Sequence, residues 1–285
     1  MSKGSIDTYF IETALAFGDY VNYKGCPLIK RSDTEYILYI PDSKKRAPSE
    51  VFSEDEYLCA GVNLMVIGGK NLDTTKSMFE DSHAEYIDLR FFNTSNVRSM
   101  TCMFNGCRAR YIDLSSLDTS NVKYMESMFQ NCGPEVLNLS SFNTSKVVDM
   151  DYMFYVYSGE LILGLNSFDT SNVENMICMF SECRAESLDL SSFNTSKVKS
   201  MECMFDSCYT KILDLRSFDT SNVKSMRAMF EYCHAESIDL TSFVTSRELD
   251  MMDIFEWCDS EIKATDSRII NRIPHNKKYN KIEVM

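Results

Sequence analysis

The chain has 285 residues, 44% of them hydrophobic, and a formal net charge of −13 at pH 7. A chain of this length can bury a sizeable core. Its acidity argues against direct binding of nucleic acid or of an anionic membrane over most of the surface, and it favours a basic partner.

Residues 1–66 are predicted to form an N-terminal cap. Residues 6–20 have the pattern of an amphipathic helix, residues 34–40 that of a strand, and the polar residues 43–49 that of an exposed loop. The first 30 residues lack a charged region followed by an uninterrupted apolar core, and no segment approaches the ~20 apolar residues of a membrane span. A cytoplasmic location is therefore expected, or the cell surface if a leader was removed.

Residues 67–258 form a tandem repeat in which the dipeptide Thr-Ser returns seven times, at spacings of 25 or 26 residues. A period of this length is typical of a stack of small units that bury their apolar faces against their neighbours. The unit that ends near Phe79 is a degraded first repeat. The seven pairs begin at Thr94, Thr119, Thr144, Thr170, Thr195, Thr220 and Thr245.

The segment 185–208, AESLDLSSFNTSKVKSMECMFDSC, shows the content of one unit. Residues 187–190 alternate between polar and apolar, as in a half-buried strand. The hydroxyls of Thr195 and Ser196 suit a helix N-cap. The apolar residues that follow have the spacing of one helical stripe, which indicates strand, turn and helix in every unit: Val198, Met201, Met204, Phe205 and Cys208.

The strings LDLSSFNTSKVKSMECMF and LDLRSFDTSNVKSMRAMF, with the signature F-x-T-S-x-V…M-x-x-M-F, resemble the BspA-like class of leucine-rich repeats over about residues 67–258. Members of that class occur mainly in surface proteins of bacteria and some protists and are usually described as adhesion or interaction proteins. The resemblance implies an α/β leucine-rich-repeat solenoid of about eight strand-turn-helix units, with a parallel sheet on the concave face and helices on the convex face. Residues 259–285 are predicted to form a C-terminal cap that ends in a strand over 281–284.

Six of the 11 cysteines occupy one column at the end of the predicted helices. We expect them to be small apolar residues packed inside the stack, in a reducing compartment. Disulfides between successive units are the alternative, because a rung spacing of about 5 Å falls within the permitted Cα separation. The column consists of Cys107, Cys132, Cys183, Cys208, Cys233 and Cys258.

Nothing in the sequence indicates an enzyme. The three histidines, His83, His234 and His275, take part in no recognisable catalytic spacing, and residues 67–70 lack the spacing of a phosphate-binding loop. The absence of a Cys-x-x-Cys pair argues against a structural zinc site. We therefore expect no catalytic residue, no cofactor and no metal.

The candidate binding residues lie at outward strand positions. One column carries a carboxylate in five units and runs through Asn138 and Gly164 in two others. It could attract a Lys- or Arg-rich partner, or each carboxylate could cap a nearby backbone amide or pair with a serine of the next turn. Both interpretations stay open. The five carboxylates belong to Asp88, Asp113, Asp189, Asp214 and Asp239.

A second outward column, two residues earlier in each unit, includes Tyr86, Tyr111 and, in the middle unit, Ile162. Exposed tyrosines beside charged groups are typical anchors of protein interfaces. Tyr86 and Tyr111 are therefore the stronger candidates for partner binding.

Three functions are consistent with these features. The first is a non-enzymatic protein-interaction module that binds a basic partner through the acidic concave face. The second is a soluble acidic inhibitor or decoy that blocks a nucleic-acid-binding protein such as a defence effector. The third is a surface adhesin. Direct nucleic-acid or membrane binding is not expected.

Overall fold

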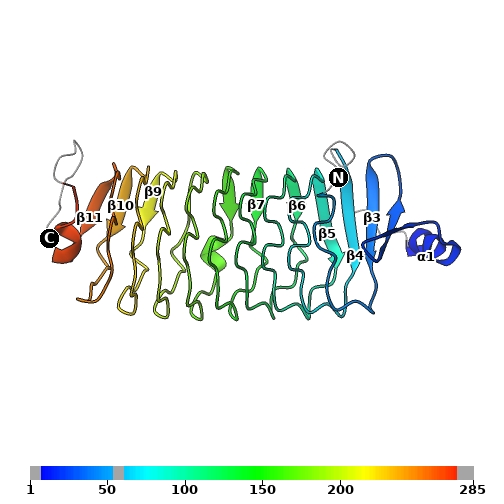
Figure 1. The fold of residues 1–285 in the computed structure, drawn as a ribbon, viewed down its shortest axis with the longest axis horizontal. Coiled ribbons are helices and arrows are strands. Elements are labelled where there is room, and N and C mark those ends of the chain that lie inside the picture. Colours follow the sequence, from blue (N-terminus) through cyan, green and yellow to red (C-terminus); the bar gives the residue numbers. More distant parts are fainter. Residues whose placement is uncertain (1–7, 54–60, 275–285) are drawn as a thin grey trace.

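The computed structural model describes residues 8–53 and 61–274. Its turns stack in a straight row between the N-terminal cap and the C-terminal end (Figure 1). Each full turn has three sides, named here after their backbone structure: a strand side, a bridge side and a turn side. Hydrogen bonds join neighbouring turns on all three sides, so the chain is a solenoid built from β-type ladders.

The N-terminal cap feeds directly into the solenoid. It contains α1 (Thr8–Phe17), β1 (Val21–Tyr23), β2 (Cys26–Lys30) and β3 (Glu35–Ile40). The first three strands pair antiparallel, and β3 then pairs in parallel with β4 (Asn63–Gly68). The predicted helix and strand of the cap are confirmed in the described residues. Strand β4 crosses the boundary predicted at residue 66.

The strand side carries short parallel strands in register. Ile87 lies opposite Ile112, and Leu213 lies opposite Ile238, so the same inward column repeats from turn to turn. Within the described residues the strands fall into three sheets, because β6 and β7 belong to different sheets and so do β8 and β9. After β4 the strands are β5 (Tyr86–Phe92), β6 (Tyr111–Asp113), β7 (Val136–Asn138), β8 (Leu161–Leu163), β9 (Ile212–Asp214), β10 (Ser237–Leu240) and β11 (Glu261–Ala264).

The bridge side is a second parallel ladder with one residue per turn. Within the described residues it consists of single bridges that run from Arg46 through Thr74 to Asp250. The Thr-Ser pair of each unit lies just before this ladder, at a corner of the turn. The helix N-cap role predicted for these hydroxyls is wrong. The hydroxyl of Thr195 donates to the carbonyl of Asp219 in the next turn (2.9 Å) and accepts from the Asp219 amide (2.8 Å). The corner threonines from Thr94 to Thr220 therefore link neighbouring turns.

The convex helices predicted for each unit are wrong. In residues 101–107 the amides of Cys102, Phe104 and Gly106 donate to carbonyls in residues 126–130 of the next turn, at 2.8–2.9 Å. The intervening amides close overlapping turns with the carbonyl three residues earlier. Because the amides bond across turns, they are not available for the i→i−4 bonds of an α-helix.

The backbone dihedrals of the turn side explain how a helix-like pattern gives turns. Each segment has two residues at positive φ, four positions apart, such as Cys203 (φ 52°) and Ser207 (φ 51°). A left-handed residue cannot continue a right-handed helix. Without helices the argument for a curved body no longer holds, and the predicted concave face is described below as the strand side. Outside the turn segments the described chain has a 3-10 turn, η1 (Leu165–Ser167), and a final helix, α3 (Ser267–Ile270).

The core is a row of identical layers. Eight phenylalanines, one per turn from Phe79 to Phe255, stack with centroids 5.3–5.9 Å apart, and a shorter stack runs from Phe168 to Phe243 at 6.2–6.3 Å. All six cysteines of the predicted column are buried, which confirms their packing inside the stack. The three cysteines five residues earlier, Cys102, Cys178 and Cys203, are half-buried.

The extra residue of the middle unit is Gly164. Strand β8 places Leu161 opposite Val136 and Leu163 opposite Asn138, so Ile162 is an inward residue. The outward columns predicted through Ile162 and Gly164 are therefore wrong by one position. Gly164 bulges at φ 89°, where a Cβ would lie 2.5 Å from the backbone nitrogen of Ser140. Only glycine fits this bulge without strain.

Candidate functional site

The five predicted carboxylates do share one outward column on the strand side. Asp88 lies opposite Asp113, and Asp214 lies opposite Asp239, in register on adjacent strands. Asp189 lies in a turn that has no assigned strand. Like charges in register repel, so the local contacts of each carboxylate decide whether the column is structural or available for binding.

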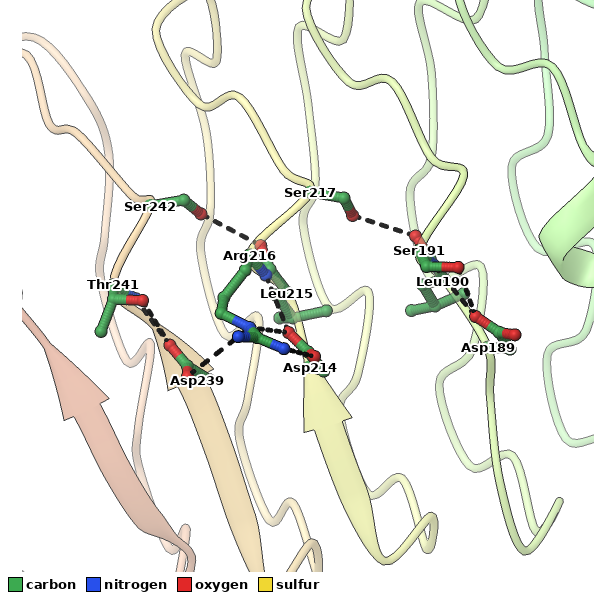
Figure 2. Close-up of polar contacts among 10 residues, drawn as sticks. All are labelled: Asp189, Leu190, Ser191, Asp214, Leu215, Arg216, Ser217, Asp239, Thr241 and Ser242. Atoms are coloured by element: carbon green, nitrogen blue, oxygen red, sulfur yellow. Dashed lines mark hydrogen bonds and ion pairs between the residues drawn. The ribbon is translucent and has the colours of Figure 1, made fainter.

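Each carboxylate caps a backbone amide two residues later. Oδ1 of Asp189 accepts from the Ser191 amide (3.2 Å) and hydroxyl (2.6 Å), and Asp239 does the same with Thr241 at 3.0 and 2.6 Å (Figure 2). Asp113 caps Ser115 in the same way. These Asx-type turns fix the corner after each strand. The capping interpretation of the column is therefore confirmed for its geometry.

Two arginines offset the repulsion between neighbouring carboxylates. Arg216 pairs with Asp214 (Nη2–Oδ2 2.5 Å) and reaches Asp239 (Nε–Oδ2 4.0 Å), as Figure 2 shows. Arg90 occupies the same place at the other end of the column, with Asp88 at 2.7 Å and Asp113 at 3.6 Å. Hydrogen bonds from Arg216 lower the pKa of Asp214, and those from Ser191 lower the pKa of Asp189. Both carboxylates are therefore ionised at neutral pH.

Serines on the same side hold the turns together just beyond the column. Ser217 donates to the carbonyl of Leu190 (2.9 Å) and Ser242 to that of Leu215 (3.1 Å), each across one turn (Figure 2). The cap within a turn and the serine bond between turns act on the same corner. Much of the polar chemistry of the strand side is thus explained by folding.

An open groove of about 520 Å³ lies across β5, β6 and β7. It brings together the predicted residues Tyr86, Tyr111 and Asp113. The remaining lining residues provide an apolar floor with hydroxyls and an amide around it: Ile112, Leu114, Ser115, Val136, Asn138, Ser140 and Ser141. Asp189, Asp214 and Asp239 do not line this groove, so the structure divides the predicted site into two regions.

The groove coincides with the break between the sheets of β6 and β7. The exposed ring of Tyr111 leans across this break, and its hydroxyl donates to Glu135 Oε2 (3.2 Å). Tyr86 is half-buried, and burial together with Asp88 and Asp113 raises its pKa. Tyr86 therefore presents a neutral, amphipathic ring to the groove, beside the exposed ring of Tyr111.

Sequence reasoning missed the charge separation between the other two sides. The eight turn segments, from residues 76–81 to 252–257, carry ten carboxylates and two cations, a net charge of −8. The bridge-side segments, from residues 70–74 to 246–250, carry eight cations and five carboxylates, a net charge of +3. Comparing charges column by column along the repeats would have revealed this difference, because each column belongs to one side.

Sequence reasoning also missed an exposed aromatic pair on the turn side. Tyr232 and Trp257 stack with centroids 6.1 Å apart and are 46% and 62% exposed. In the sequence pattern Trp257 stands out only as a departure at the end of the repeat. A comparison along the repeats could have found the pair, because the same position holds non-aromatic residues such as Ser207, Asn131 and Gly106 in other turns.

Comparison with known proteins identifies the repeat family. The family model DUF285, described as Mycoplasma protein of unknown function, matches residues 63–159 and 157–267. This match supports the resemblance to BspA-like repeat proteins. Neither the curated proteins nor the solved structures contain a match to the chain. None of the helices in the described residues combines the length and apolar character needed to cross a membrane. Because the matched regions cover more than half of its length, the chain belongs to the DUF285 family.

Proposed function

We propose that the chain is a non-enzymatic protein-interaction scaffold that binds a partner protein at the groove across β5, β6 and β7. The observation that carries the proposal is the groove itself, since it collects both tyrosines predicted as anchors beside an apolar floor. Repeat solenoids commonly act as interaction scaffolds, because their stacked turns expose extended surfaces. Tyrosine combines a large apolar ring with a hydroxyl that can bond across an interface.

A basic partner group suits the groove. The carboxylate of Asp113 is half-buried and shares Arg90 with Asp88, while the exposed Glu135 is held by the Tyr111 hydroxyl. A Lys or Arg of the partner can contact Glu135 and Asp113 while its aliphatic stem covers Val136. In this proposal Asp189, Asp214 and Asp239 extend the acidic strand side beyond the groove and contribute to attraction at a distance.

The test compares Tyr111→Ala with Ile212→Ala. Both residues start a short strand at the same repeat position, and both are exposed, at 50% and 61%. Neither change should affect folding, whereas only Tyr111 lies in the groove. A partner captured from the native cell is purified, and its affinity for each variant is measured. We expect Tyr111→Ala to weaken binding by about tenfold or more, as for an interface anchor, and Ile212→Ala to have little effect. Equal affinities would place the interface elsewhere.

The inhibitor and adhesin roles predict different responses of the same complex. If the chain occupies the nucleic-acid channel of its partner, binding weakens steeply with salt and nucleic acid competes for the site. If it is an adhesin, the protein is found in the surface fraction of the cell. An interaction scaffold instead forms a complex that survives moderate salt and depends on Tyr111.

A further inference from the structure

The aromatic pair at the C-terminal end of the turn side is a surface of a different kind from the groove. We define the Tyr232–Trp257 patch as these two rings with the flanking carboxylates of Glu231, Asp253 and Glu256. The ring planes are 9° apart, and Trp257 is the only tryptophan of the chain. Large aromatic side chains that stay exposed in a well-ordered solenoid are typical of binding surfaces.

The fold holds the two rings in place but does not require them. The Tyr232 amide donates to the carbonyl of Glu256 (2.9 Å), which fixes the register of the two turns. Both aromatic residues have positive φ, 49° and 56°, a conformation that is uncommon for bulky side chains. None of the equivalent residues in the other turns is aromatic: Asp81, Gly106, Asn131, Val156, Glu182 and Ser207. Stacking of the turns therefore does not explain the rings.

The carboxylates beside the rings are not neutralised by a direct ion pair among the described residues. The ion pairs of the described residues involve other carboxylates, such as Glu174 and Asp214. Burial raises the pKa of Glu231, and Asp206, Glu256 and Asp253 raise it further, whereas Arg227 only partly offsets them. The negative charges around the rings therefore repel one another.

We infer that the Tyr232–Trp257 patch docks a Lys- or Arg-rich segment of a partner protein. An ammonium or guanidinium group over the exposed indole gains a cation–π interaction. At the same time it relieves the repulsion among Glu231, Asp253 and Glu256. Charge complementarity selects this occupant, since an acidic segment would add to the repulsion. The patch lies on the turn side, so this inference does not depend on the strand-side groove.

The single tryptophan provides a local readout. The purified full chain is titrated with an oligolysine peptide while the emission of Trp257 is followed, and an oligoglutamate peptide serves as the control. We expect a saturable change in emission with oligolysine, with an affinity that falls as salt is raised, and no change with oligoglutamate. An emission spectrum that oligolysine leaves unchanged would overturn the proposal.

Matched variants separate the patch from general attraction to an acidic protein. Glu231→Gln with Glu256→Gln is compared with Glu160→Gln plus Glu186→Gln, which removes the same charge from exposed positions on other parts of the solenoid. Peptide affinity is measured by the fluorescence anisotropy of a labelled oligolysine. Because this readout does not use Trp257, the variant Trp257→Leu is measured in the same way. We expect about tenfold weaker binding for the patch variants, as for interface anchors, and less than about twofold for the control. Equal losses in both pairs would show general attraction only and overturn the proposal.

A competing occupant is the basic end of the chain itself, Lys277, Lys278 and Lys281, which lies outside the described residues. The full chain with all three lysines changed to Gln tests it. If this variant shows the altered Trp257 emission without any peptide, the chain's own segment occupies the patch and the proposed partner is overturned. Unchanged emission supports the partner.

Discussion

In six of the seven corners, from Thr94 to Thr220, the buried threonine hydroxyl joins two turns of the solenoid. Thr195 is fully buried and both donates to and accepts from the backbone of residue 219. Its role was invisible in the sequence, because the repeat period shows that the residue matters but not which atoms it contacts. A hydroxyl that suits a helix N-cap equally suits a bond to the next turn.

Removing that hydroxyl should destabilise the protein. Thr195→Val keeps the shape of the side chain but leaves the amide and the carbonyl of Asp219 without this partner. We expect a loss of about 1–3 kcal/mol in the free energy of unfolding, measured by urea denaturation. Ser196→Ala is the control, since the Ser196 hydroxyl donates to its neighbour Asn194 at the surface, and should cost about 0.5 kcal/mol or less. A variant as stable as the wild type would contradict the linking role.

Asp151 should make stability fall as pH rises through 6. Burial raises its pKa to about 6, with Asp149 and Glu126 adding to the effect, although the Ile177 amide donates to it at 2.7 Å. Because the folded-state pKa exceeds the ordinary value, the stability contributed by this carboxyl is fully present below about pH 4 and is lost as pH rises through 6.

Asp151→Asn keeps an oxygen to accept from Ile177 and removes the charge. At pH 7 we expect the variant to be more stable than the wild type, by no more than about 1 kcal/mol because solvent screens this half-buried group. The gain should disappear near pH 4. The measurement is urea denaturation at both pH values, with the exposed Glu160→Gln as control. A variant less stable than the wild type at pH 7 would refute the expected sign.

At the scale of elements, the turn segments show why the helix prediction failed. Their apolar residues recur at intervals that fit one face of a helix, and Met201, Met204 and Phe205 are indeed buried. Overlapping turns bury the same positions, so the pattern correctly predicts which residues form the core. It cannot tell a helix from this ladder, because the deciding hydrogen bonds join residues about one repeat apart in sequence.

Circular dichroism tests the turn segments directly. The described helices are α1, of ten residues, and α3, of four. We expect the far-ultraviolet spectrum of the full chain to have only a weak helical component. A helical content near the roughly 30% typical of globular proteins would support a leucine-rich-repeat fold with a helix in every unit and contradict the turn segments.

The bulge after β8 should tolerate no side chain. In Gly164→Ala the new Cβ meets the backbone of Leu139 and Ser140 in the preceding turn, and the residue keeps a left-handed φ of 89°. We expect a loss of roughly 2–4 kcal/mol in the free energy of unfolding, because strain and steric overlap add. Gly18→Ala is a matched control, since Gly18 also has positive φ but a Cβ at that position would meet no neighbouring atom within 4 Å. It should lose only about 1 kcal/mol.

At the scale of the whole molecule, the repeat period was enough to predict a solenoid, its inward columns and the shared column of carboxylates. Two features of the candidate site could not be predicted from the repeat period. The groove depends on where strand pairing stops, between β6 and β7, and the outward register of the middle turn depends on the bulge at Gly164. A consensus pattern shows neither where strand pairing stops nor the effect of the one inserted residue.

The continuous phenylalanine stack couples the two halves of the solenoid. Phe180 is fully buried between Phe154 at 5.3 Å and Phe205 at 5.7 Å. Phe180→Ala should cost about 3–5 kcal/mol. Because each turn contacts only its neighbours, this break should let the halves unfold separately. Hydrogen exchange at increasing urea should then show β5 and β10 losing protection at different concentrations. Loss of both together would contradict this coupling, and the exposed Tyr209→Ala serves as control.

The regular rise of the turns sets the distance between surfaces along the solenoid axis. The strand positions from Tyr111 to Ser237 are five repeats apart, so the groove and the turn that carries Tyr232 are separated by about 24 Å along the axis at ~4.8 Å per turn. A single partner that engages both surfaces must present its two determinants at that separation to gain from bivalence. Deleting one internal repeat would shorten the distance by about 5 Å without altering either surface, so unit number can set partner geometry independently of contact chemistry.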